Sequence, residues 1–245
     1  MDIPLWNIEE GYPLFYLRGY KVGGIFQTQE ELDAWKAVYN DVSYQTAKVA
    51  PGDLYFNDVR SAPKNPDEFY SNIPDSVINS YDQVYLGKSI PGFFYGLNFN
   101  IEYKNFDLGA QFTGVGDVVK YNDLRAAMEY TPGTGNNLST SIYDSWTPNN
   151  TSTSMPRVIG GDPAQNFRRS DRFVENASYF RLSNIQIGFT LPASFYDFTR
   201  KSISNLRIYA GSSNLFTITK YSGFDPESDK YPTPRVFFMG LNVRF

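Results

Sequence analysis

The stretch Arg235-Val-Phe-Phe-Met-Gly-Leu-Asn-Val-Arg-Phe245 decides the class of fold. Its residues alternate in character, and in an extended strand alternate residues point to opposite faces. One face is wholly apolar and carries Phe237, Met239, Leu241, Val243 and Phe245. The other, Phe238 apart, carries Gly240, Asn242 and Arg244. A half-apolar strand that ends on an aromatic residue is typical of a transmembrane β-barrel, whose strands alternate lipid-facing and lumen-facing residues.

A second region repeats this alternation twice in succession. From Phe93 to Tyr103 every second residue is apolar, over the length of one tilted membrane strand. The dipeptide Lys104-Asn105 then predicts a tight turn into another strand from Phe106 to Thr113. We therefore expect a β-hairpin with a very short loop, as on the periplasmic side of a barrel.

Further strands are expected over Phe180 to Leu191, over Asn205 to Thr219 and, with less distinct faces, over Leu14 to Val22. Within the first of these the alternation slips by one residue at Ser183-Asn184, which predicts a β-bulge. Together the strands predict an all-β, antiparallel transmembrane sheet. Their polar faces are expected to line a lumen with Asn98, Asn100, Gln111, Gln186 and Asn242.

Short helices and long polar segments separate the strands. Thr28 and Glu31 form a capping box that predicts a helix through Val38, and a second short helix is expected from Asn122 to Glu129. Segments of about 42–91 and 116–176 are rich in Asn, Ser, Thr, Gly and Pro. Such long loops are uncommon in compact domains but normal on the outer side of a barrel.

Composition excludes several kinds of protein. The 245 residues carry a net charge of −4 without a basic cluster, so nucleic acid is not expected as a partner. Cys and His are both absent, which removes disulfides, thiolate metal sites and the commonest general base. We predict neither an enzyme nor a cofactor. The mean hydropathy of −0.41 argues little against a membrane, because barrel strands are only half apolar.

The start of the chain, Met-Asp-Ile-Pro-Leu-Trp6, lacks the charged and apolar regions of a signal peptide. An outer-membrane protein needs such a signal. We therefore expect either that the sequence is a piece of a longer chain or that the membrane interpretation is wrong.

Several motifs, in order and spacing, resemble the SusC/RagA family of TonB-dependent outer-membrane transporters. They are Gly11–Leu14, Ser89–Gly96, Trp146–Arg157, Asp171–Pro192, Asn205–Tyr209, Asn214–Glu227 and the terminal strand. The resemblance implies that 1–245 is the C-terminal part of a 22-stranded barrel. The plug domain and the earlier strands are absent.

The resemblance also implies a function and a set of partners. It implies an outer-membrane importer of oligosaccharides or peptides. It implies contact with outer-membrane lipid, a SusD-like surface lipoprotein, and TonB through the missing N-terminal part. Two alternatives stay open: a truncated product without independent activity, and a soluble β-sandwich that binds carbohydrate.

One departure from the family pattern concerns calcium. The stretch Asp53 to Asp58 should lead into an EF-hand-like loop, but the required spacing of oxygen ligands and glycine is lost. Acidic residues do remain nearby: Asp58, Asp67, Glu68, Asp75 and Asp82. We interpret them as a solvated acidic loop, with a calcium site as the alternative.

Individual residues complete the predictions. Five loop aromatics, expected to be exposed, are candidates for stacking on sugar rings, although loop packing is the favoured interpretation for any single one. They are Trp6, Tyr12, Trp35, Trp146 and Tyr221. Arg18, Arg181 and Arg207 either line a channel or form structural ion pairs. Phe245 is predicted to be an assembly signal, because an aromatic ending resembles the one read in outer-membrane barrels.

Overall fold

The computed structural model describes residues 6–41, 48–130, 137–195, 203–228 and 231–245. The chain divides into two compact units. The first unit comprises Met1–Ile90 and Lys120–Glu175, and the second unit comprises Pro91–Val119 and Asn176–Phe245. Each is described separately.

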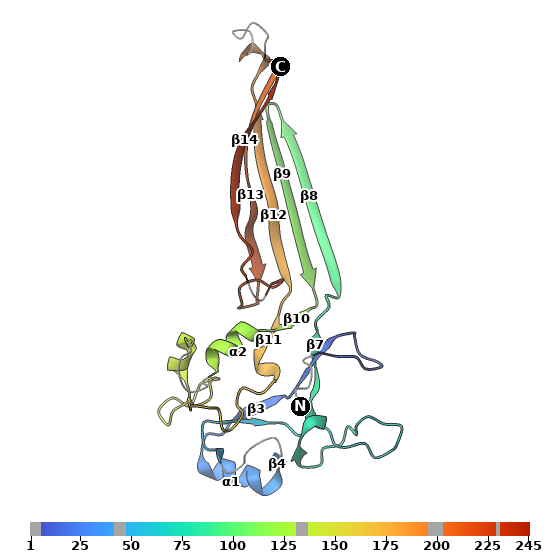
Figure 1. Ribbon diagram of the computed structural model, residues 1–245, viewed down its shortest axis with the longest axis vertical. Helices are drawn as coiled ribbons and strands as arrows, with labels where there is room; N and C mark the ends of the chain where they lie inside the picture. The colour runs from blue at the N-terminus through green and yellow to red at the C-terminus, as the bar shows by residue number, and fades with distance from the viewer. Residues whose placement is uncertain (1–5, 42–47, 131–136, 196–202, 229–230) are drawn as a thin grey trace. The chain divides into compact units, whose positions relative to one another are not determined.

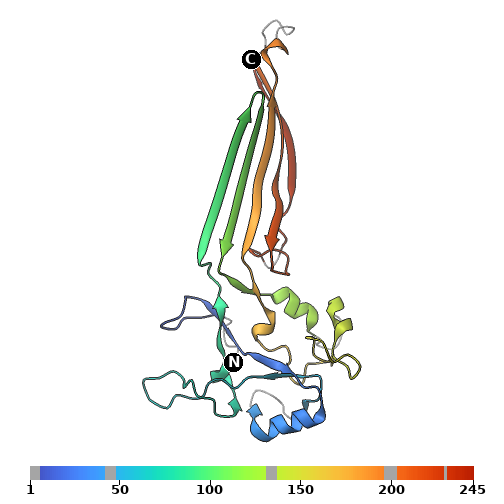
Figure 2. The same cartoon turned by 180° about the vertical axis from the view of Figure 1, so that it is seen from behind.

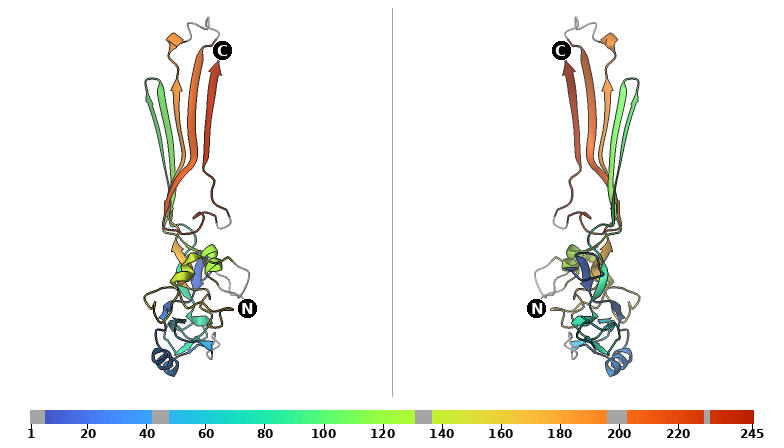
Figure 3. Two further views of the ribbon diagram at one scale, coloured as in Figure 1. Left: turned by 90° about the vertical axis from the view of Figure 1, so that its left-hand side faces the viewer. Right: turned by 90° about the vertical axis from the view of Figure 1, so that its right-hand side faces the viewer.

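The second unit is built on one five-stranded antiparallel sheet in the order β14-β13-β12-β9-β8. Its strands are β8 (Phe93–Tyr103), β9 (Phe106–Gly116), β12 (Tyr179–Thr190), β13 (Asn205–Thr219) and β14 (Val236–Arg244). Figures 1 and 3 show these long strands side by side in one layer. A 3₁₀ turn, η5 (Ala193–Phe195), follows β12. The predicted strands in this region are confirmed.

The connection between β8 and β9 is the predicted two-residue turn, which can be followed from behind in Figure 2. Tyr103 pairs with Phe106 across it, and Lys104 adopts a left-handed φ of 56°. Register then holds along both strands up to the pair Phe93 and Gly116. The hairpin prediction is therefore confirmed.

The predicted β-bulge also lies in β12. Pairing with both neighbouring strands shifts between Leu182 and Asn184, so Ser183 is the extra residue. An extra residue moves everything after it to the opposite face. Because of the bulge, Phe180 and Leu182 share their face with Ile185 and Ile187 despite the change of parity.

One face of this sheet is apolar from edge to edge. A single row runs across all five strands: Ile101, Leu108, Ile187, Ala210 and Met239. These side chains are exposed at both edges and in the middle, at 55% for Ile101, 53% for Ile187 and 86% for Met239. A β-sandwich would cover such a face with a second sheet. Among the described residues, the other sheets have only two or three short strands, so the second unit is not a sandwich.

The first unit contains small sheets and short helices. β1 (Trp6–Asn7), β2 (Tyr16–Gly19) and β7 (Val84–Lys88) form an antiparallel sheet, β3 (Val22–Ile25) pairs with β5 (Leu54–Phe56), and β4 (Asn40–Asp41) runs parallel to β6 (Val77–Ile78). The helices are α1 (Gln29–Val38), α2 (Asp123–Glu129), and the 3₁₀ turns η2 (Ser80–Asp82), η3 (Thr140–Asp144) and η4 (Asp171–Phe173). β10 (Val119–Tyr121) pairs with β11 (Val174–Asn176).

The strand expected over Leu14 to Val22 is wrong as a single element. β2 ends at Gly19, and the next residue is recruited by a distant segment: the Tyr20 N–H donates to the Arg169 carbonyl at 3.0 Å. A Cβ at Gly19 would lie 2.9 Å from that carbonyl oxygen, so the chains approach too closely for a longer regular strand. The pairing partner, far along the sequence, broke the predicted strand in two.

Both predicted helices are confirmed. Each begins at a residue whose side chain caps its first turn. The Thr28 hydroxyl accepts a hydrogen bond from the Glu31 N–H at 3.2 Å, and the Asn122 side chain accepts one from the Arg125 N–H at 2.9 Å. No helix among the described residues has the length and apolar character needed to cross a bilayer.

The two long polar segments fold into this first unit. Its buried apolar cluster joins residues far apart in sequence: Tyr20, Ile25, Leu54, Phe56, Ile78, Trp146 and Ala164. Described parts of both segments therefore contribute to a shared core, although their composition predicts loops.

Candidate functional site

The polar face of the five-stranded sheet carries all five residues predicted to line a lumen. Asn98 pairs with Gln111, Asn100 shares a row with Gln186 through Gly109, and Asn242 pairs with Arg207. Asn98, Asn100, Gln111 and Asn242 are exposed, and Gln186 is half-buried. The structure brings these residues onto one surface. That this surface faces a lumen remains a prediction.

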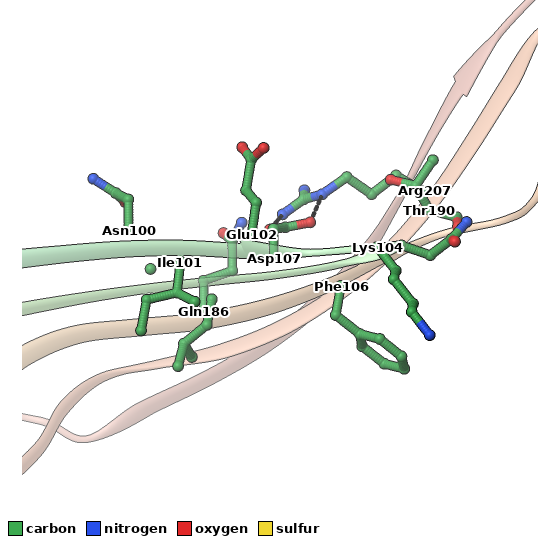
Figure 4. A pocket seen from close by; sticks show the side chains of 12 residues that line it. Asn100, Ile101, Glu102, Lys104, Phe106, Asp107, Gln186, Thr190 and Arg207 are labelled. Carbon is green, nitrogen blue, oxygen red and sulfur yellow. Dashed lines mark hydrogen bonds and ion pairs between the residues drawn. The ribbon is translucent and has the colours of Figure 1, made fainter.

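An ion pair bridges this face. Arg207 of β13 donates from Nε to Asp107 Oδ1 of β9 at 2.9 Å and pairs through its second nitrogen with the other carboxylate oxygen, as Figure 4 shows. The bridge passes over β12 at Gly188, where a Cβ would lie 2.4 Å from both side chains. Gly188 therefore makes room for the pair, and Arg207 is a paired charge.

A hollow of about 470 Å³ surrounds the β8–β9 turn beside this pair. Figure 4 places Asn100, Glu102 and Asp107 on one side of the strands and Phe106 on the other. Amide, carboxylate and guanidinium groups there offer hydrogen-bond donors and acceptors to a polar ligand. The arrangement is suited to holding or passing a hydroxyl- or amide-rich molecule.

The far end of the same polar face holds a second, more buried set of charges, the Arg181 cluster (Arg181, Tyr179, Thr217, Asp225 and Glu227). Arg181 donates to both oxygens of Asp225 at 2.9 and 2.8 Å, to Glu227 at 2.6 Å and to Thr217 at 2.9 Å. The Tyr179 hydroxyl donates to Glu227 at 2.6 Å. Arg181 and Asp225 are each only 5% exposed. These contacts fix the segment after β13 onto β12.

The three arginines whose role the sequence left undecided all form hydrogen bonds or ion pairs. Arg181 and Arg207 form ion pairs, whereas Arg18 lies in β2 of the first unit and donates to the carbonyls of Ser80 and Gln83, each at 3.3 Å. Their partners Asp107, Asp225 and Glu227 were not singled out from the sequence. Opposite charges on polar strand faces were the available signal for Asp107 and Arg207, but their pairing needs the register, whereas Asp225 and Glu227 lie after β13 and pair only through the tertiary structure.

Two of the candidate aromatic residues are not exposed, contrary to expectation. Trp146 is 8% exposed and its ring occupies the space beside Gly52, while its Nε1 donates to Gln27 at 2.8 Å. Tyr221 is 6% exposed, and its ring covers Gly223. In each case a glycine without a side chain opens a place that the ring fills.

Two further candidates, Tyr12 and Trp35, contact neighbouring aromatic rings. Half-buried Tyr12 packs 5.0 Å from Tyr16, and half-buried Trp35 packs edge-on at 5.5 Å from Phe26. Trp6 lies in β1, but its side chain is outside the described residues. Contact between these residues and a substrate stays a prediction.

The acidic residues near Asp58 face backbone N–H groups. Asp82 accepts from the N–H groups of Val59, Arg60 and Asn79 at 2.8–3.0 Å, and Asp58 accepts from Ser76 at 2.5 Å. Within the described ranges no group of three or more acidic side chains is placed to hold a metal ion. The contacts support a role for these carboxylates in fixing loop backbone.

Asp58→Asn is expected to stabilise the first unit at neutral pH, by no more than about 1 kcal/mol. Burial, with Asp82 and Asp75 nearby, raises the pKa of Asp58, and one of its buried oxygens has no partner among the described residues. A raised pKa means that ionisation of Asp58 lowers the stability of the folded state. This cost is absent below the ordinary aspartate pKa of about 3.9 and grows as the pH rises from there through the raised pKa of the folded state. The melting temperatures of the parent and of Asp58→Asn should converge as the pH is lowered towards 3. A difference in melting temperature that stays constant with pH would contradict this.

An antiparallel sheet in one layer, apolar on one face and polar on the other, is the construction of a transmembrane β-barrel wall. Comparisons with known proteins agree. The TonB-dependent receptor P3 of Formosa agariphila is 33% identical over 189 residues, 69% of this chain, and receptor P26 of the same organism is 26% identical over 97% of the chain. The TonB-dependent receptor SusC of Bacteroides thetaiotaomicron is 30% identical over 70% of the chain.

The chain belongs to the TonB-dependent receptors and resembles their SusC/RagA-like members. No family model matches it. The structure of the RagAB peptide transporter shares its fold, with a TM-score of 0.66 over 95% of this chain and 23% of that one, at 24% identity. The chain spans only 17–23% of the length of these curated relatives.

Proposed function

We propose that this chain is part of an outer-membrane, TonB-dependent importer. The single observation that carries the proposal is the sheet with an exposed apolar face and a polar, charged opposite face. Only lipid would cover such an apolar face without a second protein layer. In this proposal 1–245 is the C-terminal part of a 22-stranded barrel. It supplies barrel wall, lumen lining and outer segments.

Substrate and partners follow from the relatives. We propose oligosaccharides or peptides as the cargo, because one relative is SusC and a structural neighbour is a peptide transporter. A SusD-like lipoprotein, outer-membrane lipid, and TonB acting through a preceding segment complete the assembly. Phe245, which directly follows β14 and is exposed, is the proposed assembly signal. A truncated product without independent activity is the alternative.

A pair of adjacent residues tests the membrane placement. Residues 1–245 contain no cysteine, so only cysteines elsewhere in the full-length receptor have to be replaced by serine before single cysteines are introduced here. Ile101→Cys and Asn100→Cys change neighbouring positions on opposite faces of β8. In the full-length receptor in liposomes, a fluorophore attached to the Ile101→Cys variant should be quenched strongly by spin-labelled lipid. The same fluorophore on the Asn100→Cys variant should be quenched only weakly.

Tyr143→Cys gives the control for label quality, because Tyr143 lies in the first unit and is 92% exposed. It should react with a water-soluble reagent and escape lipid quenching. Equal quenching of the Asn100→Cys and Ile101→Cys variants would mean that the two faces share one environment, and the barrel-wall proposal would fail.

A further inference from the structure

The first unit contains a hollow that the sequence did not reveal. It lies beside α2, has a volume of about 410 Å³, and none of the predicted site residues lines it. Two alanines, Ala126 and Ala127, two aromatic rings, Tyr130 and Phe167, and three polar side chains, Asp162, Gln165 and Arg168, surround it. We call it the Tyr130 hollow.

The aromatic side of the hollow is formed by two rings that meet at an angle, one of which packs on a buried residue. The rings of Tyr130 and Phe167 meet edge-on, with centroids 5.7 Å apart and planes at 72°. Phe167 is held from behind by stacking at 6.0 Å on Phe173, which is fully buried. Tyr130 itself is 37% exposed, so ring surface is available to a ligand. The small side chains of α2 leave space beside it.

Its polar part is oriented by the protein before any ligand binds. Asp162 accepts N–H groups of Asn166 at 2.7 Å and Phe167 at 3.0 Å, which leaves carboxylate lone pairs for further donors. Arg168 is held by its ion pair with Asp41 and lies 3.8 Å over the Phe56 ring. Preorganised groups of this kind bind without a large ordering cost.

Gln165 adds an adaptable group at the rim. It is exposed and has a left-handed φ of 55°, a conformation that costs a non-glycine residue energy. The turn that holds it is closed by the Gln165 N–H, which donates to the Asp162 carbonyl at 3.0 Å. Strained residues that the surrounding structure maintains cluster at binding sites.

The chemistry favours a neutral sugar ring over other occupants. A pyranose has an apolar C–H face for Tyr130 and hydroxyl groups that both donate and accept, which match the Asp162 carboxylate and the Gln165 amide. A peptide that binds by strand addition needs a free strand edge, which the hollow, bounded by a helix and a turn, does not offer. An anion would meet Asp162, and the guanidinium of Arg168 is already paired.

We propose that the Tyr130 hollow binds one sugar ring of an oligosaccharide ligand. The inference rests on the proposed importer function and deepens it, because it selects glycans over peptides as cargo.

The test is calorimetric titration of the full-length receptor in detergent. The probes are neutral oligosaccharides of four to eight units, namely α- and β-linked glucans, mannans and xylans. At least one should bind, and Tyr130→Ala should weaken its binding by about tenfold or more, since exposed aromatic anchors dominate such contacts. Gln165→Ala should weaken it less. Tyr143→Ala removes an equally exposed ring elsewhere and should leave binding unchanged.

Three results would overturn the inference: no probe binds, Tyr130→Ala binds like the parent, or Tyr143→Ala loses as much affinity. Hydrogen exchange of first-unit peptides in each variant shows whether the first unit has kept its fold, and Gln165→Ala serves as the second test if Tyr130→Ala has not. Peptide uptake without sugar binding would leave the importer intact and remove only this inference. Failure of the lipid-quenching experiment would instead remove the importer.

Discussion

Asp53→Ala should destabilise the first unit by about 3–5 kcal/mol, the typical effect of breaking a buried ion pair. Asp53 is fully buried and binds Arg157 through both oxygens at 2.8 Å. It also accepts from Asn166 at 2.9 Å and from the Ala50 N–H at 2.9 Å. Alanine would leave the half-buried guanidinium of Arg157 and two further donors without their acceptor, where three chain segments meet.

Tryptophan fluorescence during denaturant unfolding measures this effect, because all three tryptophans of the chain belong to the first unit. Asp33→Ala is the matched control. Asp33 is exposed on α1 and accepts one hydrogen bond, from Gln29, so its replacement should change stability by no more than about 0.5 kcal/mol. If the two variants unfold at the same denaturant concentration, Asp53 does not hold the unit together.

Arg181→Met should release the segment 220–228 from the polar face of the sheet. Methionine fills a similar volume but leaves Asp225 buried without its cation, a loss of about 3–5 kcal/mol. Because each 1.4 kcal/mol is a factor of ten, hydrogen exchange in the segment should accelerate by about a hundredfold or more. Cleavage by trypsin after Lys220 should accelerate as well.

Arg207→Met is the matched control, because it removes an arginine from the same face of the sheet but outside the Arg181 cluster. Arg207 lies on the same face, but its ion pair with Asp107 is partly exposed, so solvent screening weakens it. Exchange in the segment 220–228 should stay unchanged in this variant. Equal acceleration in both variants would mean that the segment responds to sheet stability in general and not to the Arg181 cluster.

Lowering the pH should release the segment 220–228 of the parent protein, as Arg181→Met does at neutral pH. Burial acts to raise the pKa of Asp225, but hydrogen bonds from Thr233 and the Glu227 N–H, together with Arg181, outweigh it and lower the pKa. A lowered pKa means that the ionised group stabilises the fold above an ordinary aspartate pKa of about 3.9, and that this contribution disappears as pH falls through the lowered value. The parent segment should therefore open in acid, whereas Arg181→Met should not open further, because protonation of Asp225 removes the charge that this variant leaves buried without a cation.

Local rules were sufficient for the long strands of the second unit and for the helices. Alternation of apolar residues placed the long strands and their faces, a two-residue turn set the register of β8 and β9, and the slip at Ser183 located the bulge. The side-chain caps of Thr28 and Asn122 defined the helix starts. All of these depend on neighbours within a few residues, so the sequence carries the information directly.

Only the tertiary structure decided what the long polar segments become. Trp146 is buried because Gly52, nearly a hundred positions earlier, leaves room for its ring, and Asp53 is ionically paired because Arg157 folds back onto it. The Tyr130 hollow likewise combines α2 with residues 162–168. Such contacts join segments whose separation along the chain has no periodicity. By itself, therefore, the sequence determined an antiparallel sheet with one apolar and one polar face, whereas long-range packing determined which aromatic rings are buried and which are exposed.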